Sequence, residues 1–143
     1  MEMVELTTLD QARAFFQGDR FATNSGMRIE DAAPGRSLIR LTLTEAHRNA
    51  MGFLMGGVPL TMADFACAVA AHYGPGAGQW VSADTHVSFL APCRGRELAA
   101  EAVCLKRGRK LSFYEVFIHD EADDLVAKAS FILCSITNGT QRI

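Results

Sequence analysis

The sequence predicts an α+β fold, in which an antiparallel sheet of about five or six strands wraps around one long central helix. Three observations lead to this prediction. Residues 51–71 are apolar apart from Thr61 and Asp64, and the run is long enough for a buried helix. The segments after it alternate between polar and apolar residues as strands do, and short turn-forming sequences separate them. A single apolar helix must then cover one face of the resulting sheet.

Before the apolar run, the chain is expected to form a short helix and two strands. Residues 9–17 have the apolar spacing of an amphipathic helix. Residues 26–29 suit a short strand, and Pro34 and Gly35 form a turn signal. Residues 37–44 present one wholly apolar face and one mixed face, which is the pattern of a half-buried strand.

The long helix is expected over residues 57–72. Pro59 suits its first turn, where backbone N–H groups have no partner within the helix. The glycine-rich segment 74–78 ends it. One face of the helix is expected to carry Leu60, Asp64, Cys67 and Ala71.

Four strands are expected after the helix. Residues 81–90 alternate cleanly, with Ser82 and Val87 on opposite faces. Residues 97–106 contain good helix formers as well, so helix and strand both stay open there. Two further strands, residues 111–119 and residues 125–137, complete the sheet.

Length and composition predict a single domain, residues 1–143, with its core at about residues 26–137. The chain is 49% hydrophobic and 21% charged, which is ordinary for a soluble protein. A net charge of −2 gives no general reason to expect nucleic acid as a partner. The N-terminus lacks the features of a secretory signal, and Asp64 argues against a membrane span in the apolar run. We therefore expect a cytoplasmic protein with neither a nucleic acid nor a membrane partner.

The cysteines and histidines give no sign of a metal site. Four cysteines have no paired spacing and are expected to be reduced thiols: Cys67, Cys93, Cys104 and Cys134. The histidines lack the spacing of metal ligands, and His47 is expected in a solvated loop with Arg48. A serine nucleophile in a Gly-x-Ser-x-Gly turn is absent. We expect no metal and no cofactor.

Asp64 is the residue that most suggests chemistry. It is the only formally charged residue between Arg48 and Asp84, and an unpaired carboxylate in an apolar helix is expected to be buried at a cost. Glycines at a helix N-terminus let a carbonyl oxygen approach the N–H groups there. Asp64 and Gly56 therefore predict a site that polarises a carbonyl and attacks it with help from a carboxylate. The alternatives are a carboxylate that pairs in the core or across a subunit contact, and glycines that simply begin the helix.

The run NAMGFLMGG, from Asn49 to Gly57, with Asp64 seven residues further on, resembles the acyl-CoA thioesterases of the hotdog fold. The similarity is greatest to the phenylacetic-acid-degradation (PaaI-like) type and its animal relatives. Their usual pattern is an Asn, a Gly three residues later, His-Gly-Gly, and then a helix that carries Asp. The resemblance covers roughly residues 35–136, including the segment from Val81 to Gly95 and the hairpin at Lys106 to Arg109.

The resemblance implies hydrolysis of an acyl-coenzyme A thioester to free acid and coenzyme A. It implies that Asp64 is the nucleophile or the general base, and that the Gly56 N–H polarises the thioester carbonyl. Ser82 would position the attacking water, and Asn49 would orient water or substrate. From the residues alone, Ser82 could equally be a surface serine, and Asn49 could satisfy its own loop backbone.

Four further residues are expected at the substrate. Met55 stands where the family usually has a supporting His, which would make the pocket more apolar and put rate and substrate preference in question. Gly57 lies beside it. The basic hairpin, with Arg107 and Arg109, would suit the phosphates of coenzyme A, although such a cluster is more often a solvated turn.

The resemblance also implies self-association to a dimer, which often pairs again into a tetramer. The site would lie at the subunit interface, with Asp64 from one subunit and Asn49 and Gly56 from the other. Two other functions stay open. One is a non-catalytic acyl-CoA-binding module that lost turnover with the His, and the other is an acyl-thioester dehydratase or hydratase. The acyl group itself is not determined by the sequence.

Overall fold

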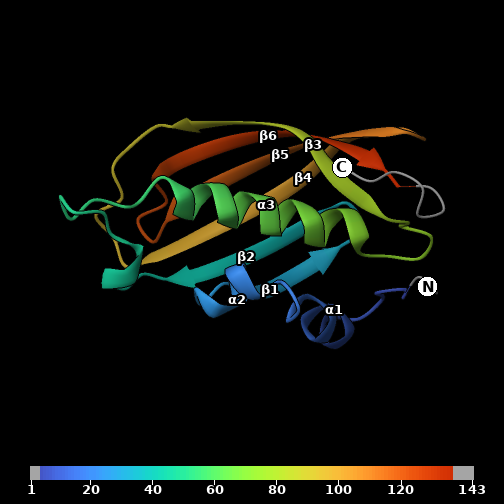
Figure 1. The fold of residues 1–143 in the computed structure, drawn as a ribbon, viewed down its shortest axis with the longest axis horizontal. Helices are drawn as coiled ribbons and strands as arrows, with labels where there is room; N and C mark the ends of the chain where they lie inside the picture. Colours follow the sequence, from blue (N-terminus) through green and yellow to red (C-terminus); the bar gives the residue numbers. More distant parts are fainter. Residues whose placement is uncertain (1–3, 137–143) are drawn as a thin grey trace.

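The computed structural model describes residues 4–136 and confirms the predicted α+β architecture. Six antiparallel strands form one sheet in the order β1-β2-β4-β5-β6-β3, and the long helix α3 lies across one face of it (Figure 1). The elements are α1 (Leu9–Phe16), α2 (Arg20–Asn24), β1 (Arg28–Ala33), β2 (Arg36–Thr42), a 3-10 helix η1 (Glu45–His47), α3 (Gly57–His72), β3 (Trp80–Phe89), β4 (Glu97–Arg107), β5 (Leu111–Asp120) and β6 (Leu125–Ser135).

Three local predictions needed correction or completion. The helix α2 was not predicted, because five residues are too few to show a helical period. The first strand begins at Arg28 rather than residue 26, since Gly26 has a φ of +100° in the turn after α2. Residues 97–106, left open between helix and strand, lie in β4 because β2 and β5 pair with it on both sides. The predicted end of the last strand, residue 137, lies outside the described residues.

The core lies between α3 and the concave face of the sheet. Met62, Ala66 and Val69 of α3 are fully buried, as are Ile39 and Ile118 on strands opposite. Burial of a Met, Val or Ile side chain contributes about 1.5–3 kcal/mol. A polar contact joins the two layers, since the Ser37 hydroxyl donates a hydrogen bond of 2.6 Å to the Ala66 carbonyl. No helix within residues 4–136 is both long and apolar enough to cross a membrane.

The edge strand β3 carries a bulge at Ala83 that changes which way Ser82 points. Directly opposed residues of neighbouring strands share a face of the sheet. Three opposed pairs run along β3 and β6: Ser82–Leu133, Thr85–Phe131 and Val87–Ala129. All three β6 members are buried, so Ser82 lies on the helix side together with Val87. Strict alternation predicted Ser82 and Val87 on opposite faces of the strand. This was wrong, because the bulge inserts one extra residue between them.

Cys67 provides a test of this packing. It is fully buried in α3, and burial raises the pKa of its thiol. Because the thiolate is the reactive form, we expect Cys67 to react with iodoacetamide only as fast as the protein unfolds. Mass spectrometry of labelled peptides, with and without urea, measures this. Labelling of Cys67 in the folded protein as fast as that of the half-buried Cys104 would contradict the packing.

Candidate active site

Asp64 lies in the middle of α3 and is exposed in the single chain, which corrects the prediction of a buried carboxylate. The four residues expected on one helix face divide accordingly: Leu60 and Asp64 are exposed, whereas Cys67 and Ala71 are buried. The Ser82 hydroxyl donates a hydrogen bond of 3.0 Å to Asp64 Oδ1. The bulge in β3 thus turns Ser82 toward the helix, where it contacts Asp64. Within residues 4–136, no basic side chain forms an ion pair with Asp64, so its second oxygen remains available.

The N-terminus of α3 is open to solvent. Gly56 caps the helix without a side chain, and both Gly56 and Gly57 are exposed. A Cβ added at Gly57 would meet nothing within 4 Å, and one at Gly56 would touch the ring of Phe89 at 3.4 Å. In the described part of the chain, the Gly56 N–H donates to no protein acceptor. An acceptor atom can therefore approach this N–H and gain from the positive end of the helix dipole.

Asn49 organises the loop before α3. Its Oδ1 accepts hydrogen bonds of 3.0 Å from the N–H groups of Met51 and Phe53, and its own N–H donates to the Phe53 carbonyl at 2.7 Å. Asn49 therefore satisfies the backbone of its own loop, which was one of the two roles predicted for it. The side-chain amide nitrogen has no acceptor among residues 4–136, so the group can also face a ligand.

His47 was expected in solvent, and the structure corrects this, because the residue is 5% exposed. The N–H of Thr44 donates to Nδ1 at 2.9 Å, so Nε2 carries the proton and donates to the Ser25 carbonyl at 2.8 Å. The His47 carbonyl in turn accepts from the N–H of Met55 at 2.9 Å. Both ring nitrogens are therefore engaged in holding the loop, and neither is available for catalysis.

A single chain keeps Gly56 and Asp64 apart. They are eight residues apart along one helix, which corresponds to about 12 Å along its axis. A reacting carbonyl must lie within about 3 Å of both an oxyanion donor and the attacking group. The predicted site residues are therefore divided into two groups, which we call half-sites: Asn49, Met55 and Gly56 at the N-terminus of α3, and Asp64 with Ser82 in its middle.

Asp19 is a second carboxylate near Asp64 that the sequence did not reveal. The two line a hollow of about 210 Å³ between α2 and α3, whose other residues are Arg20, Phe21, Ala22, Thr61 and Phe65. The pKa of Asp19 is raised by partial removal of its carboxyl from water and by the charge of Asp64, against a smaller opposing effect of His72. Since α2 itself was not predicted, no signal pointed to this residue.

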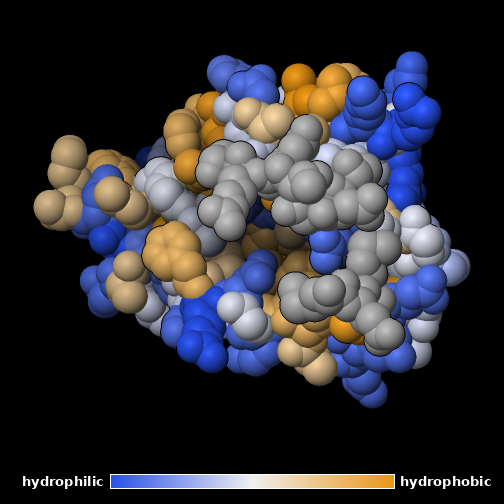
Figure 2. Space-filling model, turned by 45° about the vertical axis from the view of Figure 1, so that its right-hand side comes forward, coloured by the Kyte–Doolittle hydropathy of each residue, from blue (hydrophilic) through white to orange (hydrophobic). Residues whose placement is uncertain are grey.

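An apolar cavity of about 310 Å³ adjoins the N-terminus of α3. Its lining residues are Phe53, Leu54, Gly56, Pro59, Phe89, Leu90, Ala91, Pro92, Cys93 and Val126. Met55 stands beside it and is 53% exposed. Exposed hydrophobic side chains also occur elsewhere, in patches among charged ones (Figure 2). The nearby cavity gives the Gly56 half-site room for a nonpolar group.

The basic hairpin lies at the other end of α3. The Arg107 guanidinium donates to the carbonyls of Gly76 and Ala77 at 3.1 and 2.6 Å, and it stacks 5.6 Å from the ring centre of Trp80. Arg107 therefore braces the turn between α3 and β3. Arg109 is exposed and forms no ion pair with the described residues.

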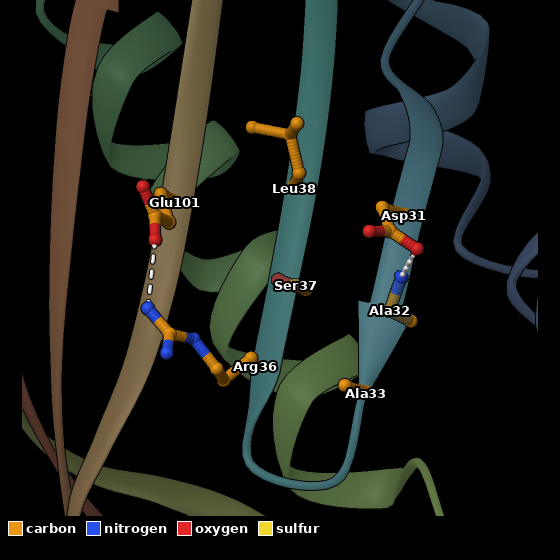
Figure 3. A pocket seen from close by; sticks show the side chains of 7 residues that line it. All are labelled: Asp31, Ala32, Ala33, Arg36, Ser37, Leu38 and Glu101. Atoms are coloured by element: carbon orange, nitrogen blue, oxygen red, sulfur yellow. Dashed lines mark hydrogen bonds and ion pairs between the residues drawn. The ribbon is translucent and has the colours of Figure 1, made fainter.

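A further hollow of about 240 Å³ lies on β1, β2 and β4 (Figure 3). Arg36 and Glu101 form a 3.0 Å ion pair across it, and Leu38 projects beside them. None of the predicted site residues lines it. Within residues 4–136, no group of three or more His, Cys, Asp or Glu side chains is arranged to hold a metal ion.

Comparison with known proteins identifies the family. The model of the thioesterase superfamily matches residues 51–127, which include every half-site residue except Asn49. The chain belongs to this superfamily. The family prediction is thereby confirmed, and membership supports the prediction of a thioester hydrolase.

The relatives agree with this assignment. Human acyl-coenzyme A thioesterase 13 is 30% identical over 95 residues, which cover 66% of this chain and 68% of that protein. A presumed esterase of Deinococcus radiodurans is 38% identical over 97 residues, but the match covers 67% of this chain and 64% of the relative, less than two thirds of its length.

Solved structures confirm the hotdog fold. Zebrafish thioesterase superfamily member 2 aligns with a TM-score of 0.82 at 26% identity and covers 90% of this chain and 99% of its own. The PaaI protein of Escherichia coli aligns with a TM-score of 0.81 at 23% identity, over 91% of this chain and 97% of its own, and so shows the shared fold.

The coupling between Asp19 and Asp64 gives a prediction. Removing a neighbouring negative charge makes ionisation easier, so Asp64→Asn is expected to lower the pKa of Asp19. Carboxyl-carbon NMR titration of Asp19 in the wild type and the variant measures the shift. A matched change of the distant exposed Asp123 to Asn should leave Asp19 unaffected. An unchanged Asp19 titration in Asp64→Asn would show that the two groups do not interact.

Proposed function

We propose that this protein hydrolyses acyl-coenzyme A thioesters to the free acid and coenzyme A. One observation carries the proposal: the exposed Asp64 carboxylate is oriented by Ser82 and keeps one oxygen available. A carboxylate held in this way can attack a carbonyl or take a proton from water. Superfamily membership and the name of the human relative support thioester chemistry.

The proposed reaction begins with the thioester oxygen at the Gly56 N–H, where the helix end stabilises the negative charge that develops during attack. Either Asp64 takes a proton from a water that adds to the carbonyl carbon, or it adds itself and water then cleaves the resulting anhydride. In both routes the C–S bond breaks and coenzyme A leaves as a thiolate. A thiol has a pKa of about 8.5, so its departure needs no strong acid. Ser82 orients Asp64 and is available to hold the water.

The proposed site needs two subunits, because α3 separates Gly56 from Asp64 by about 12 Å. A second copy that presented its own Gly56 beside Asp64 would satisfy both requirements. The β3 edge supports such an arrangement, since Ser82 and Thr85 are exposed in the single chain although they face the helix side. We therefore propose a homodimer with two equivalent composite sites, and leave its pairing into a tetramer as an extension of the same proposal.

Met55 and Gly57 lie where a bound thioester would enter this site, and Met55 adds an adaptable apolar surface to the cavity. Of the two hairpin arginines, Arg109 is available for the phosphates of coenzyme A, whereas Arg107 already binds two carbonyls. The reduced cysteines and an acyl-CoA substrate favour a cytoplasmic location. No cofactor is required by this chemistry.

A histidine-dependent dehydratase has no specific support. His72, the histidine on α3, uses Nδ1 with the Ala68 carbonyl at 2.7 Å and Nε2 with the N–H of Trp80 at 3.0 Å. If turnover proves absent, the alternative is a non-catalytic acyl-CoA-binding protein. Its loss of turnover would be explained by Met55, which stands where the family usually has a His.

The first test examines both the proposed substrate class and the catalytic role of Asp64. Thiol release from short, medium and long acyl-CoA esters and from arylacetyl-CoA should show turnover by the wild type. Asp64→Asn should lower kcat by roughly 100- to 10,000-fold, the range of general-base contributions. Since Asp64 is exposed, stability should change by only about 0.5 kcal/mol. Retention of more than about a tenth of wild-type kcat would rule out the proposed role of Asp64.

A second test addresses the composite site. Asp64→Asn lacks the carboxylate, and Asn49→Ala loses the acceptor that holds the loop before Gly56. Each variant alone should be inactive. After mixing and subunit exchange, hybrid dimers should regain up to about a quarter of wild-type activity, because one site in each hybrid is intact and half of the dimers are hybrids. Mixed samples that stay inactive despite exchange, shown by native mass spectrometry, would contradict the two-subunit site.

A further inference from the structure

Arg48 connects two loops at the N-terminal end of α3. Its backbone forms a bridge with Leu54, and its half-buried side chain reaches the loop between β3 and β4. There Nη1 donates to the Cys93 carbonyl and Nη2 donates to the Gly95 carbonyl, each at 3.1 Å. Within residues 4–136 it forms no ion pair. The guanidinium therefore serves as a tie between backbone segments.

Each of these two loops contributes a wall of the 310 Å³ cavity. Phe53 and Leu54 belong to the loop before α3, and Leu90 and Cys93 belong to the loop after β3. Both loops lie at the same end of the molecule, to the left in Figure 1. Arg48 is attached to the first wall by its backbone and to the second by its guanidinium. The side chain therefore ties the two walls directly to each other.

The second wall is fixed on its other sides. The N–H groups of Leu90 and Ala91 donate to the Val126 carbonyl at 2.8 and 3.2 Å. At the far end of the loop, the Glu121 carboxylate accepts from the N–H groups of Arg96 and Glu97, which lowers its pKa. Arg48 completes this set of anchors on the side of the active-site loop. A planar guanidinium can bind two carbonyls at once, and a lysine ammonium cannot reproduce that geometry.

We infer that Arg48 is a positioning residue that sets the width of this cavity, and that the cavity receives the acyl group of the thioester. Apart from the Cys93 thiol, every side chain that lines it is a hydrocarbon, which suits an acyl chain or ring. The pantetheine arm carries two amides that would lose their hydrogen bonds there. This inference rests on the proposed function, and it makes Arg48 a determinant of acyl specificity without contact with the substrate.

The test compares Arg48→Met, Arg48→Lys and the control Arg94→Met. Arg94 lies on the same loop, is exposed and has no hydrogen-bond or ion-pair partner in the described chain. Arg94→Met therefore removes the same charge as Arg48→Met without breaking a tie between loops. For Arg48→Met we expect KM for the best acyl-CoA to rise about tenfold and the preference among acyl groups to flatten, with kcat changed by less than about threefold. Arg48→Lys should lie between, and Arg94→Met should match the wild type.

Binding of non-hydrolysable S-alkyl-coenzyme A thioethers, measured by calorimetry, gives a readout independent of turnover. The same flattening should appear in Kd across the alkyl series. Unchanged preferences in both Arg48 variants, or a fall in kcat at constant KM, would overturn the inference and leave the proposed hydrolysis intact. A wild type that binds thioethers but releases no thiol would instead overturn the proposed hydrolysis, and the Kd series would still test Arg48. A wild type that binds none of them would overturn both.

Discussion

The structure depends on the burial of one apolar helix. α3 packs along one face of the sheet, and Met62, Ala66 and Val69 are removed from water there. The same helix begins at two exposed glycines, and among residues 4–136 the N–H of Gly56 has no acceptor. Packing thereby fixes the direction of the helix dipole and holds its positive end rigidly at the surface, where a carbonyl oxygen can reach it.

The rigidity of this helix also keeps the proposed oxyanion donor and the proposed catalytic carboxylate of one chain apart. Because Gly56 and Asp64 belong to one α-helix, their separation cannot be closed by motion of a loop. The arrangement requires another surface to bring an oxyanion donor and a carboxylate together. An exposed edge strand with Ser82 beside Asp64 offers such a surface, and this is the physical basis for proposing a site shared between two copies.

Around the helix end, polar side chains serve mainly to hold backbone in place. Asn49, His47 and Arg48 each bind peptide groups of the loops there, and Arg107 does the same at the opposite end of α3. Residues that look like catalytic or ligand-binding groups in sequence are thus partly employed in shaping the site. Rigid loops of this kind preserve the shape of an apolar cavity, which is what the proposed discrimination among acyl groups requires.

The sequence by itself determined the fold class, the long helix and the alternating strands, and it predicted that Gly56 and Asp64 form a chemical motif. These features rest on local periodicity and on residue types that a short window contains. The tertiary structure decided the exposure of Asp64, the reversal of Ser82 by the bulge at Ala83, and the approach of Asp19. It also showed that Arg48 binds the carbonyls of Cys93 and Gly95, which lie 45 and 47 residues further along the chain. Such contacts depend on how distant segments pack, and no local pattern records them.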